Sequence, residues 1–296
     1  MHHHTHHAPR HHPHDHRPDG ESMAEVLDLD AEMHKGYVEQ LLGGIARQLA
    51  REPRTVLDIG AGTGAGTLAL ARRFPHAEVV AVDRAPEMLA RIRKASERNG
   101  FGDRVHTVEA DLDAGLPTVD PIDLAWAALS LHHVEDPDAL LRQLFEVMEP
   151  GGTVVITEME SQPRFLPDDI GIGTPGLEAR CHAAAASRGW NRYPDWSDTL
   201  LRAGFEMVEK RHDELGVDVD DTARRYAHAV LGRMRAGFEP ALSGEDRDTL
   251  DLLTGHGPES VLHRTDLVVR GDRTVWIARA AKTHGSVMTH GSVIRP

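Results

Sequence analysis

Glycine stands at every second position from 60 to 66, directly behind a short apolar run that begins at Val56. The run has the length and residue types of a buried strand, and the residues behind the glycines, 67–74, are typical of a helix. A strand, a glycine loop and a helix in this order present backbone N–H groups and the positive end of the helix to an anionic or nucleotide-like ligand. Glycine suits such a loop because a Cβ atom would block close approach of the ligand to the backbone. We therefore expect the ligand site of this chain around residues 56–66.

The glycine spacing fits two kinds of nucleotide loop. Gly60, Gly62 and Ala65 satisfy the dinucleotide pattern G-x-G-x-x-G/A. Asp83 follows about 20 residues later, where a carboxylate can accept both hydroxyl groups of a ribose. The same stretch has the form acidic-x-G-x-G-x-G when Asp58 is included. Asp83 suits either loop, so the choice depends on the residues that follow.

Apolar runs of strand length alternate with helical patterns along most of the chain, as in a doubly wound α/β sheet. After residues 56–59, the expected strands are 78–83, 105–109, 122–126, 153–157, 205–211 and 274–280. Ligands bind such sheets outside the carboxyl ends of the strands. Residues that directly follow a strand are therefore candidates for the site, and they include Asp111, the pair His132 and His133, and Glu158.

Five features favour the acidic-x-G-x-G-x-G form and resemble the class I S-adenosylmethionine (SAM)-dependent methyltransferases, close to the small-molecule group that includes the ubiquinone/menaquinone-type enzymes. They are Asp111 after the third strand, Leu131-His132-His133-Val134 after the fourth, Glu149-Pro150-Gly151-Gly152 before the fifth, Ala203-Gly204-Phe205 before the sixth, and the final strand itself. The resemblance runs from about Val38 to Lys282 and is strong from Thr55 to Glu158. It implies a Rossmann-like, doubly wound α/β sheet of seven strands in the order 3-2-1-4-5-7-6, the last strand antiparallel, with helical cap insertions.

The resemblance also implies a SAM site at the carboxyl edge of the sheet. It places Asp58 at the methionine end of SAM and Asp83 at the ribose. It places Asp111 at the adenine and Leu129 near the sulfonium. The residues expected to contact the cofactor are Asp58, Gly60, Ala61, Gly62, Thr63, Gly64, Asp83, Arg84, Asp111, Leu112, Ala128 and Leu129. The chemistry of SAM agrees, because loop N–H groups suit its carboxylate and nearby carboxylates suit its ammonium group.

Methyl transfer by in-line displacement gains mainly from alignment and exclusion of water, and it needs at most one base to take a proton from the acceptor. His133, His132 and Glu158 are the candidates for that base, because imidazole has a suitable pKa and all three follow strands beside the expected methyl position. A mechanism by proximity alone stays open. The acceptor would be enclosed by two cap segments, about 160–195 and 218–264, where the resemblance is weak.

The composition limits the class of protein. The balance of 33 Lys+Arg against 47 Asp+Glu gives a net charge of -14, which argues against a nucleic-acid partner. No apolar run is long enough to span a membrane and no signal-peptide core is evident, so we expect a cytoplasmic protein without membrane contact. The lone Cys181 excludes a multi-cysteine metal site, and no metal is expected in the active site. A homodimer is left open, because residues 218–264 suit either a cap or a dimer surface.

The two ends of the chain differ in composition from its middle. Residues 1–22 are rich in histidine and broken by prolines. We expect a disordered tail there, which could hold a divalent metal loosely through neutral imidazoles. Residues 283–296 contain a repeated Thr-His-Gly-Ser-Val and form a second tail that is expected to be disordered. One methyltransferase-like domain, 23–282, lies between them.

The function that this pattern predicts is transfer of a methyl group from SAM to a small-molecule acceptor that the sequence does not identify. An NAD(P)-dependent oxidoreductase is the alternative. It accounts for the glycine loop and Asp83, but it leaves Asp111 and the final strand unexplained, and the chain has no Tyr-x-x-x-Lys pair. A nucleic-acid methyltransferase would carry Asn/Asp-Pro-Pro-Tyr/Phe behind the fourth strand, which this sequence lacks. A non-catalytic SAM-binding or metal-buffering protein is a further class, with the histidine tail as its functional part.

Overall fold

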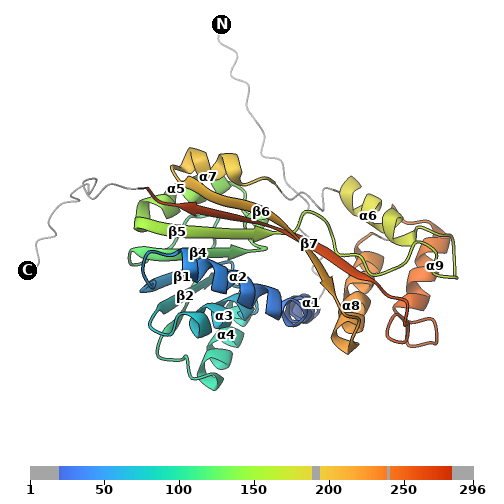
Figure 1. The fold of residues 1–296 in the computed structure, drawn as a ribbon. Coiled ribbons are helices and arrows are strands. Elements are labelled where there is room, and N and C mark those ends of the chain that lie inside the picture. The colour runs from blue at the N-terminus through green and yellow to red at the C-terminus, as the bar shows by residue number, and fades with distance from the viewer. Residues whose placement is uncertain (1–19, 189–193, 239–240, 282–296) are drawn as a thin grey trace, which may run out of the picture.

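The computed structural model describes residues 20–188, 194–238 and 241–281, with a mixed sheet at the centre (Figure 1). The strands are β1 Thr55–Ile59, β2 Glu78–Asp83, β3 Val105–Glu109, β4 Ile122–Ala128, β5 Met148–Glu158, β6 Glu206–Val217 and β7 Val269–Arg279. They form one 7-stranded sheet in the order β3-β2-β1-β4-β5-β7-β6. Strands β1 to β5 are parallel, and β7 is antiparallel to both β5 and β6. The predicted strand order and the antiparallel last strand are confirmed.

Helices cover both faces of this sheet. Those described are α1 Gly20–Met33, α2 Lys35–Gln48, α3 Ala65–Arg73, α4 Pro86–Arg98, α5 Pro137–Val147, α6 Leu177–Ser187, α7 Ser197–Ala203, α8 Asp221–Gly237 and α9 Gly244–Leu253, with a short 3-10 helix, η1 Leu131–His133. Apolar side chains of α2, α3 and α4 pack on one face around Trp126 and Val155. Those of α5 and α7 pack on the other face around Leu57 and Ile156. The central strands are buried on both faces, which explains their near-continuous apolar runs in the sequence.

Strands β6 and β7 are longer than the sequence predicted. The expected strands were 205–211 and 274–280, but β6 continues to Val217 and β7 begins at Val269, and these two residues are paired. The extension of β6 was missed because it is mostly polar, which an edge strand partly open to solvent allows. The sequence left open whether residues 267–269 belong to the last strand, and the structure includes Val269 in it. The extended pair of strands leads from the sheet to the cap helices (Figure 1).

The cap helices have a hydrophobic core of their own. Helix α6 lies within residues 160–195 and helices α8 and α9 lie within 218–264, the two segments expected as caps. Buried side chains such as Phe165, Tyr226 and Leu250 join these helices into one cluster. Helix α1 also packs against α8, so it lies between the cap and the sheet (Figure 1).

The tail boundary differs slightly from the expectation. Helix α1 begins at Gly20, inside the predicted tail of residues 1–22, because Ala24 and Leu29 are buried and anchor its first turns to the protein. The rest of both predicted tails lies outside the described residues. Within the described ranges, no helix has the length and apolar character needed to cross a membrane.

Candidate functional site

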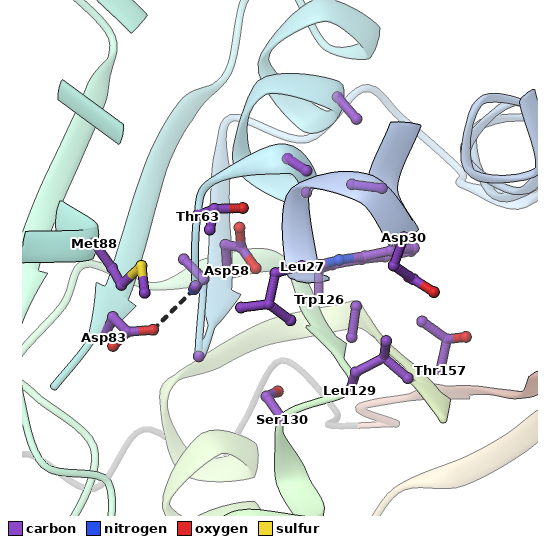
Figure 2. A pocket seen from close by; sticks show the side chains of 18 of the residues that line it. Leu27, Asp30, Asp58, Thr63, Asp83, Met88, Trp126, Leu129, Ser130 and Thr157 are labelled. Carbon is purple, nitrogen blue, oxygen red and sulfur yellow. Dashed lines mark hydrogen bonds between the residues drawn. The ribbon is translucent and has the colours of Figure 1, made fainter. Parts of the chain in front are cut away.

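A cavity of about 650 Å³ opens where β1, β2 and β4 end. This volume is in the range of sites that bind small molecules. Loops behind these strands form its floor, and α1 and α2 form its roof. In Figure 2, Asp83 and Met88 lie toward one end of the cavity, and Asp30 and Thr157 lie toward the other. Helix α1 passes over the glycine loop with Leu27 directed at it, so it would cover part of a ligand in the cavity.

The physical reason why glycine is needed differs between positions of the loop. Gly60, Gly62 and Gly64 all have positive φ angles, of 69°, 53° and 91°. A Cβ atom on Gly60 would lie 2.5 Å from the Cβ of Ser130, and one on Gly64 would lie 2.5 Å from Ile92 Cγ1. A Cβ on Gly62 would meet only the end of Leu27, at 3.6 Å. Close packing inside the protein therefore requires Gly60 and Gly64, in addition to the ligand approach that the sequence suggested.

Asp83 ties the glycine loop to strand β2. Its Oδ2 accepts a hydrogen bond from the backbone N–H of Gly62 at 2.8 Å, drawn as a dashed line in Figure 2. Its Oδ1 accepts another from the N–H of Ala85 at 2.9 Å. An ionised carboxylate has about four acceptor positions, so these two bonds leave room for hydroxyl donors from a ligand. Asp83 borders the cavity, as a ribose-binding residue must.

Asp58 and Trp126 lie side by side on β1 and β4 and both border the cavity. Asp58 is 3% exposed, and the hydroxyl of Thr67 donates to its Oδ2 at 2.6 Å. Burial raises the pKa of Asp58 to about 7, the nearby charge of Asp83 adds to the rise, and the hydrogen bonds from Thr67 oppose it. The indole N–H of Trp126 is buried and has no acceptor among the described residues. A carboxylate poised to ionise next to an unpaired donor is complementary to the ammonium and carboxylate of an amino acid.

Strand β4 ends in a strained turn at the cavity wall. Leu129 has φ 55°, and it is the one residue besides glycine with positive φ in the described part of the chain. Its N–H donates to the carbonyl of Thr157 at 2.9 Å, which holds the turn against β5. Backbone strain of this kind is typical of functional sites. Ala128 and Leu129 both border the cavity, so the turn shapes its floor.

The three candidate bases do not share one position. His133 borders the cavity, whereas His132 and Glu158 lie behind it. The Nδ1 of His132 is 2.8 Å from Oε2 of Glu158, whose side chain is fully buried. The rings of His132 and His133 are 4.0 Å apart. The structure thus links Glu158 to His132 and packs His132 against His133, and it brings only His133 to the cavity.

The remaining expected residues also differ in position. Asp111 borders the cavity, but its Oδ1 also accepts from the N–H of Asp113 at 3.1 Å, so it shapes its own turn. Ala61, Thr63, Arg84 and Leu112 border the cavity as well. Gly64 does not, because it faces Ile92 of α4 instead.

Sequence reasoning missed several residues of the cavity. Trp126 was treated only as part of a strand, although its register opposite Asp58 could have revealed it. Leu27 and Asp30 come from α1, and Arg273 comes from β7, both far from the glycine loop in sequence. No local pattern marks such residues, because only the folded chain brings them together. No group of three or more metal-ligating side chains occurs in the part of the chain that the structure describes, and the histidine tail lies outside it.

Comparison with known proteins decides between the two kinds of loop. Residues 56–152 match the methyltransferase domain family. The malonyl-[acyl-carrier protein] O-methyltransferase of Halorhodospira halophila is 36% identical over 186 residues, which cover 62% of this chain and 59% of that protein. The demethylmenaquinone methyltransferase of Thermus thermophilus is 38% identical over 117 residues, which cover 39% of this chain and 52% of that protein. Residues 56–152 therefore carry a methyltransferase domain, and the chain is similar to class I SAM-dependent methyltransferases.

The fold of this chain has a counterpart among solved structures. A crystal structure of a Bacillus halodurans protein, described there as a candidate methyltransferase, superposes with a TM-score of 0.52 at 20% identity. The superposition covers 81% of this chain and 99% of that one. The chain spans about half to three fifths of the length of the two sequence relatives named above. They give no support to the oxidoreductase alternative.

Proposed function

We propose that this methyltransferase transfers the methyl group of SAM to an oxygen atom of a small-molecule acceptor. The proposal rests mainly on one observation: the cavity joins a loop-bound carboxylate, Asp83, to a buried donor and carboxylate, Trp126 and Asp58. SAM supplies an electrophilic methyl group on a sulfonium, which a lone pair of the acceptor displaces in line. Oxygen is favoured as the methylated atom because the Halorhodospira relative is named as an O-methyltransferase.

SAM would occupy the part of the cavity from Asp83 to Trp126. Asp83 would accept the ribose hydroxyls, and Asp111 with Leu112 would border the adenine. Toward the middle of the cavity, Asp58 would face the ammonium group and Trp126 would donate to the carboxylate, so that both buried groups gain partners. The apolar side chain and the backbone of the turn at Leu129 would line the reacting centre and exclude water from it.

His133 is the residue best placed to act as a base. It borders the cavity directly behind the Leu129 turn, and an acceptor hydroxyl there could lose its proton to the imidazole. His132 would be a positioning residue, held by Glu158 and packed against His133. An acceptor carboxylate would need no base, because it is already ionised at neutral pH. The cytoplasmic location, a homodimer and metal binding by the tail stay predictions.

The raised pKa of Asp58 gives SAM binding a pH dependence. Burial favours its protonated form, so folding without ligand loses stability as pH rises from about 4, the usual pKa of an unfolded Asp, toward 7. A cation favours the ionised form, so SAM affinity should rise between pH 5.5 and 7.0, by up to about tenfold per pH unit. Calorimetric titration should show this rise in the wild type and a flat profile in Asp58→Asn. Asp113→Asn, at an exposed position on the cavity rim, is the control and should keep the rise.

The activity itself is tested by release of S-adenosylhomocysteine. The full chain would be incubated with SAM and a panel of small carboxylic acids, phenols, alcohols and amines. We expect release above the acceptor-free background with at least one oxygen acceptor, and a product heavier by one methylene unit. Release with amine acceptors alone would contradict oxygen methylation, and tight NADH binding without SAM binding would contradict the proposal as a whole.

A further inference from the structure

A buried guanidinium lies at the end of the cavity opposite Asp83. Arg273 is 5% exposed and borders the cavity from β7. Val275, two residues further along β7, pairs with Thr157 of the neighbouring strand β5. Side chains two residues apart on a strand share one face, so Arg273 and Thr157 lie on the same cavity-lining face. In Figure 2 Thr157 lies beside Asp30, which is the ion-pair partner of Arg273.

Arg273 is only partly satisfied by the protein. Its Nη2 donates to the two oxygens of Asp30 at 2.9 and 3.2 Å, and its Nη1 donates to the carbonyl of Asp272 at 2.8 Å. These three hydrogen bonds all come from Nη1 and Nη2, and none of them uses the Nε–H. A guanidinium has five N–H donors, and taking it out of water is costly unless they are paired.

The carboxylate of Asp30, which pairs with Arg273, also has other partners. Asp30 accepts a further hydrogen bond from the hydroxyl of Tyr226 at 3.0 Å, and His34 Nε2 lies 3.6 Å from it. Burial lowers the pKa of His34, so this imidazole is neutral at pH 7 and adds no second cation. One carboxylate thus serves a guanidinium and a hydroxyl, and the guanidinium still has donors left for an anion in the cavity.

We propose that Arg273 binds a carboxylate group of the methyl acceptor, an inference that rests on the proposed function. The planar guanidinium fork matches a carboxylate in shape and charge. A phosphate dianion fits less well, because Arg273 is the only buried cation among the described cavity residues. The other cations at the cavity border are exposed, namely Lys35, Arg72 and Arg84.

The strand spacing separates this carboxylate from the methylated atom. Arg273 is on β7 and the Leu129 turn follows β4, with β5 between them. Two strand spacings amount to about 10 Å between backbones. The hydroxyl of Thr157 lies on the strand between, is buried, and has no partner among the described residues. The acceptor is therefore a short acid whose carboxylate lies several bonds away from the oxygen that is methylated, with a polar atom near Thr157.

The competing explanation is that the Arg273–Asp30 pair only fastens α1 to β7. The two explanations predict opposite effects for Asp30→Asn. If the Arg273–Asp30 pair is purely structural, Asp30→Asn breaks it, and the affinity of the cavity for an anion does not increase. If Arg273 binds the acceptor, Asp30→Asn removes the carboxylate that competes with the acceptor for the guanidinium, so anion binding becomes tighter. The introduced amide keeps an oxygen that can accept from the hydroxyl of Tyr226.

The test measures dicarboxylate binding by calorimetry in the presence of saturating S-adenosylhomocysteine. The probes are malonate, succinate and glutarate, each with its diamide as an uncharged match. We expect at least one acid to bind the wild type while its diamide does not. Arg273→Gln should weaken that binding by about ten- to hundredfold, the effect of losing a charged hydrogen bond, and Asp30→Asn should strengthen it. Arg273→Lys keeps the charge but not the planar fork, so its affinity for the acid should lie between those of the wild type and Arg273→Gln.

S-adenosylhomocysteine binding separates this inference from the proposed function. All three variants should bind it with the wild-type affinity, and thermal unfolding checks that they are folded. If Arg273→Gln does not fold, the Asp30→Asn measurement alone decides the matter. Equal binding of acids and diamides by the wild type, or unchanged acid binding in Arg273→Gln or Asp30→Asn, would overturn the role of Arg273. Failure of the wild type to bind S-adenosylhomocysteine would overturn the proposed function instead.

Discussion

Replacement of Asp83 by alanine should weaken SAM binding by about a hundredfold or more. The variant lacks the carboxylate that we propose accepts the ribose hydroxyls, and each such hydrogen bond contributes about 1.5–3 kcal/mol when one partner is charged. The substitution would also release the N–H groups of Gly62 and Ala85, which Asp83 holds at 2.8 and 2.9 Å, so the loop would lose its anchor to β2. Calorimetric titration with SAM measures the change directly.

The matched control for this substitution is Glu109→Ala. Glu109 pairs with Asp83 across β2 and β3, so the same charge is removed one strand away. It is exposed and does not border the cavity, so SAM affinity should stay within about twofold of wild type, as for a screened surface charge. Equal losses in the two variants would mean that general electrostatics, and not a ribose contact, explains the result for Asp83.

Gly60→Ala should destabilise the protein far more than Gly62→Ala. Both positions have positive φ, which costs an alanine about 1–2 kcal/mol. At Gly60 the new Cβ would also lie 2.5 Å from the Cβ of Ser130, an overlap that adds about 1–3 kcal/mol. At Gly62 the nearest atom is the mobile end of Leu27, at 3.6 Å.

Thermal unfolding of the two glycine variants distinguishes these effects. For a domain of this size, about 1 kcal/mol lowers the midpoint by roughly 2–4 °C. Gly60→Ala should therefore lower the midpoint by roughly 5–15 °C, and Gly62→Ala by a few degrees only. Gly62→Ala should still weaken SAM binding, because its Cβ would project into the cavity beneath α1. Similar midpoints for both variants would contradict the packing of Gly60 against Ser130.

The parts of the fold that the sequence predicted are those with strong local signals. Strand β1, the glycine loop and helix α3 follow one another within about twenty residues, and each has a clear apolar or glycine pattern. The order of the strands was predicted from the resemblance to class I methyltransferases, and the structure confirms it. The polar ends of β6 and β7 carry no such pattern, because their pairing with each other, and not burial, holds them in the sheet.

The lining of the cavity was predicted where it depends on one loop and was missed where it depends on distant elements. Asp58 and Asp83 each end or flank a strand of the first βαβ unit, so their meeting at one edge follows from the topology. Arg273 reaches the same cavity only because β7 inserts between β5 and β6, and Asp30 reaches it only because α1 lies across the loop. The separation of His133 from Glu158 likewise depends on side-chain directions that the sequence does not specify.

The proposed function requires that the cavity behind β1, β2 and β4 binds SAM. Isothermal titration calorimetry of the full chain with S-adenosylhomocysteine, and in parallel with NADH, tests it most directly. We predict saturable binding of one S-adenosylhomocysteine per chain, lost in Asp83→Ala and kept in Glu109→Ala, with no heat from NADH. Saturable NADH binding without any response to S-adenosylhomocysteine would contradict it.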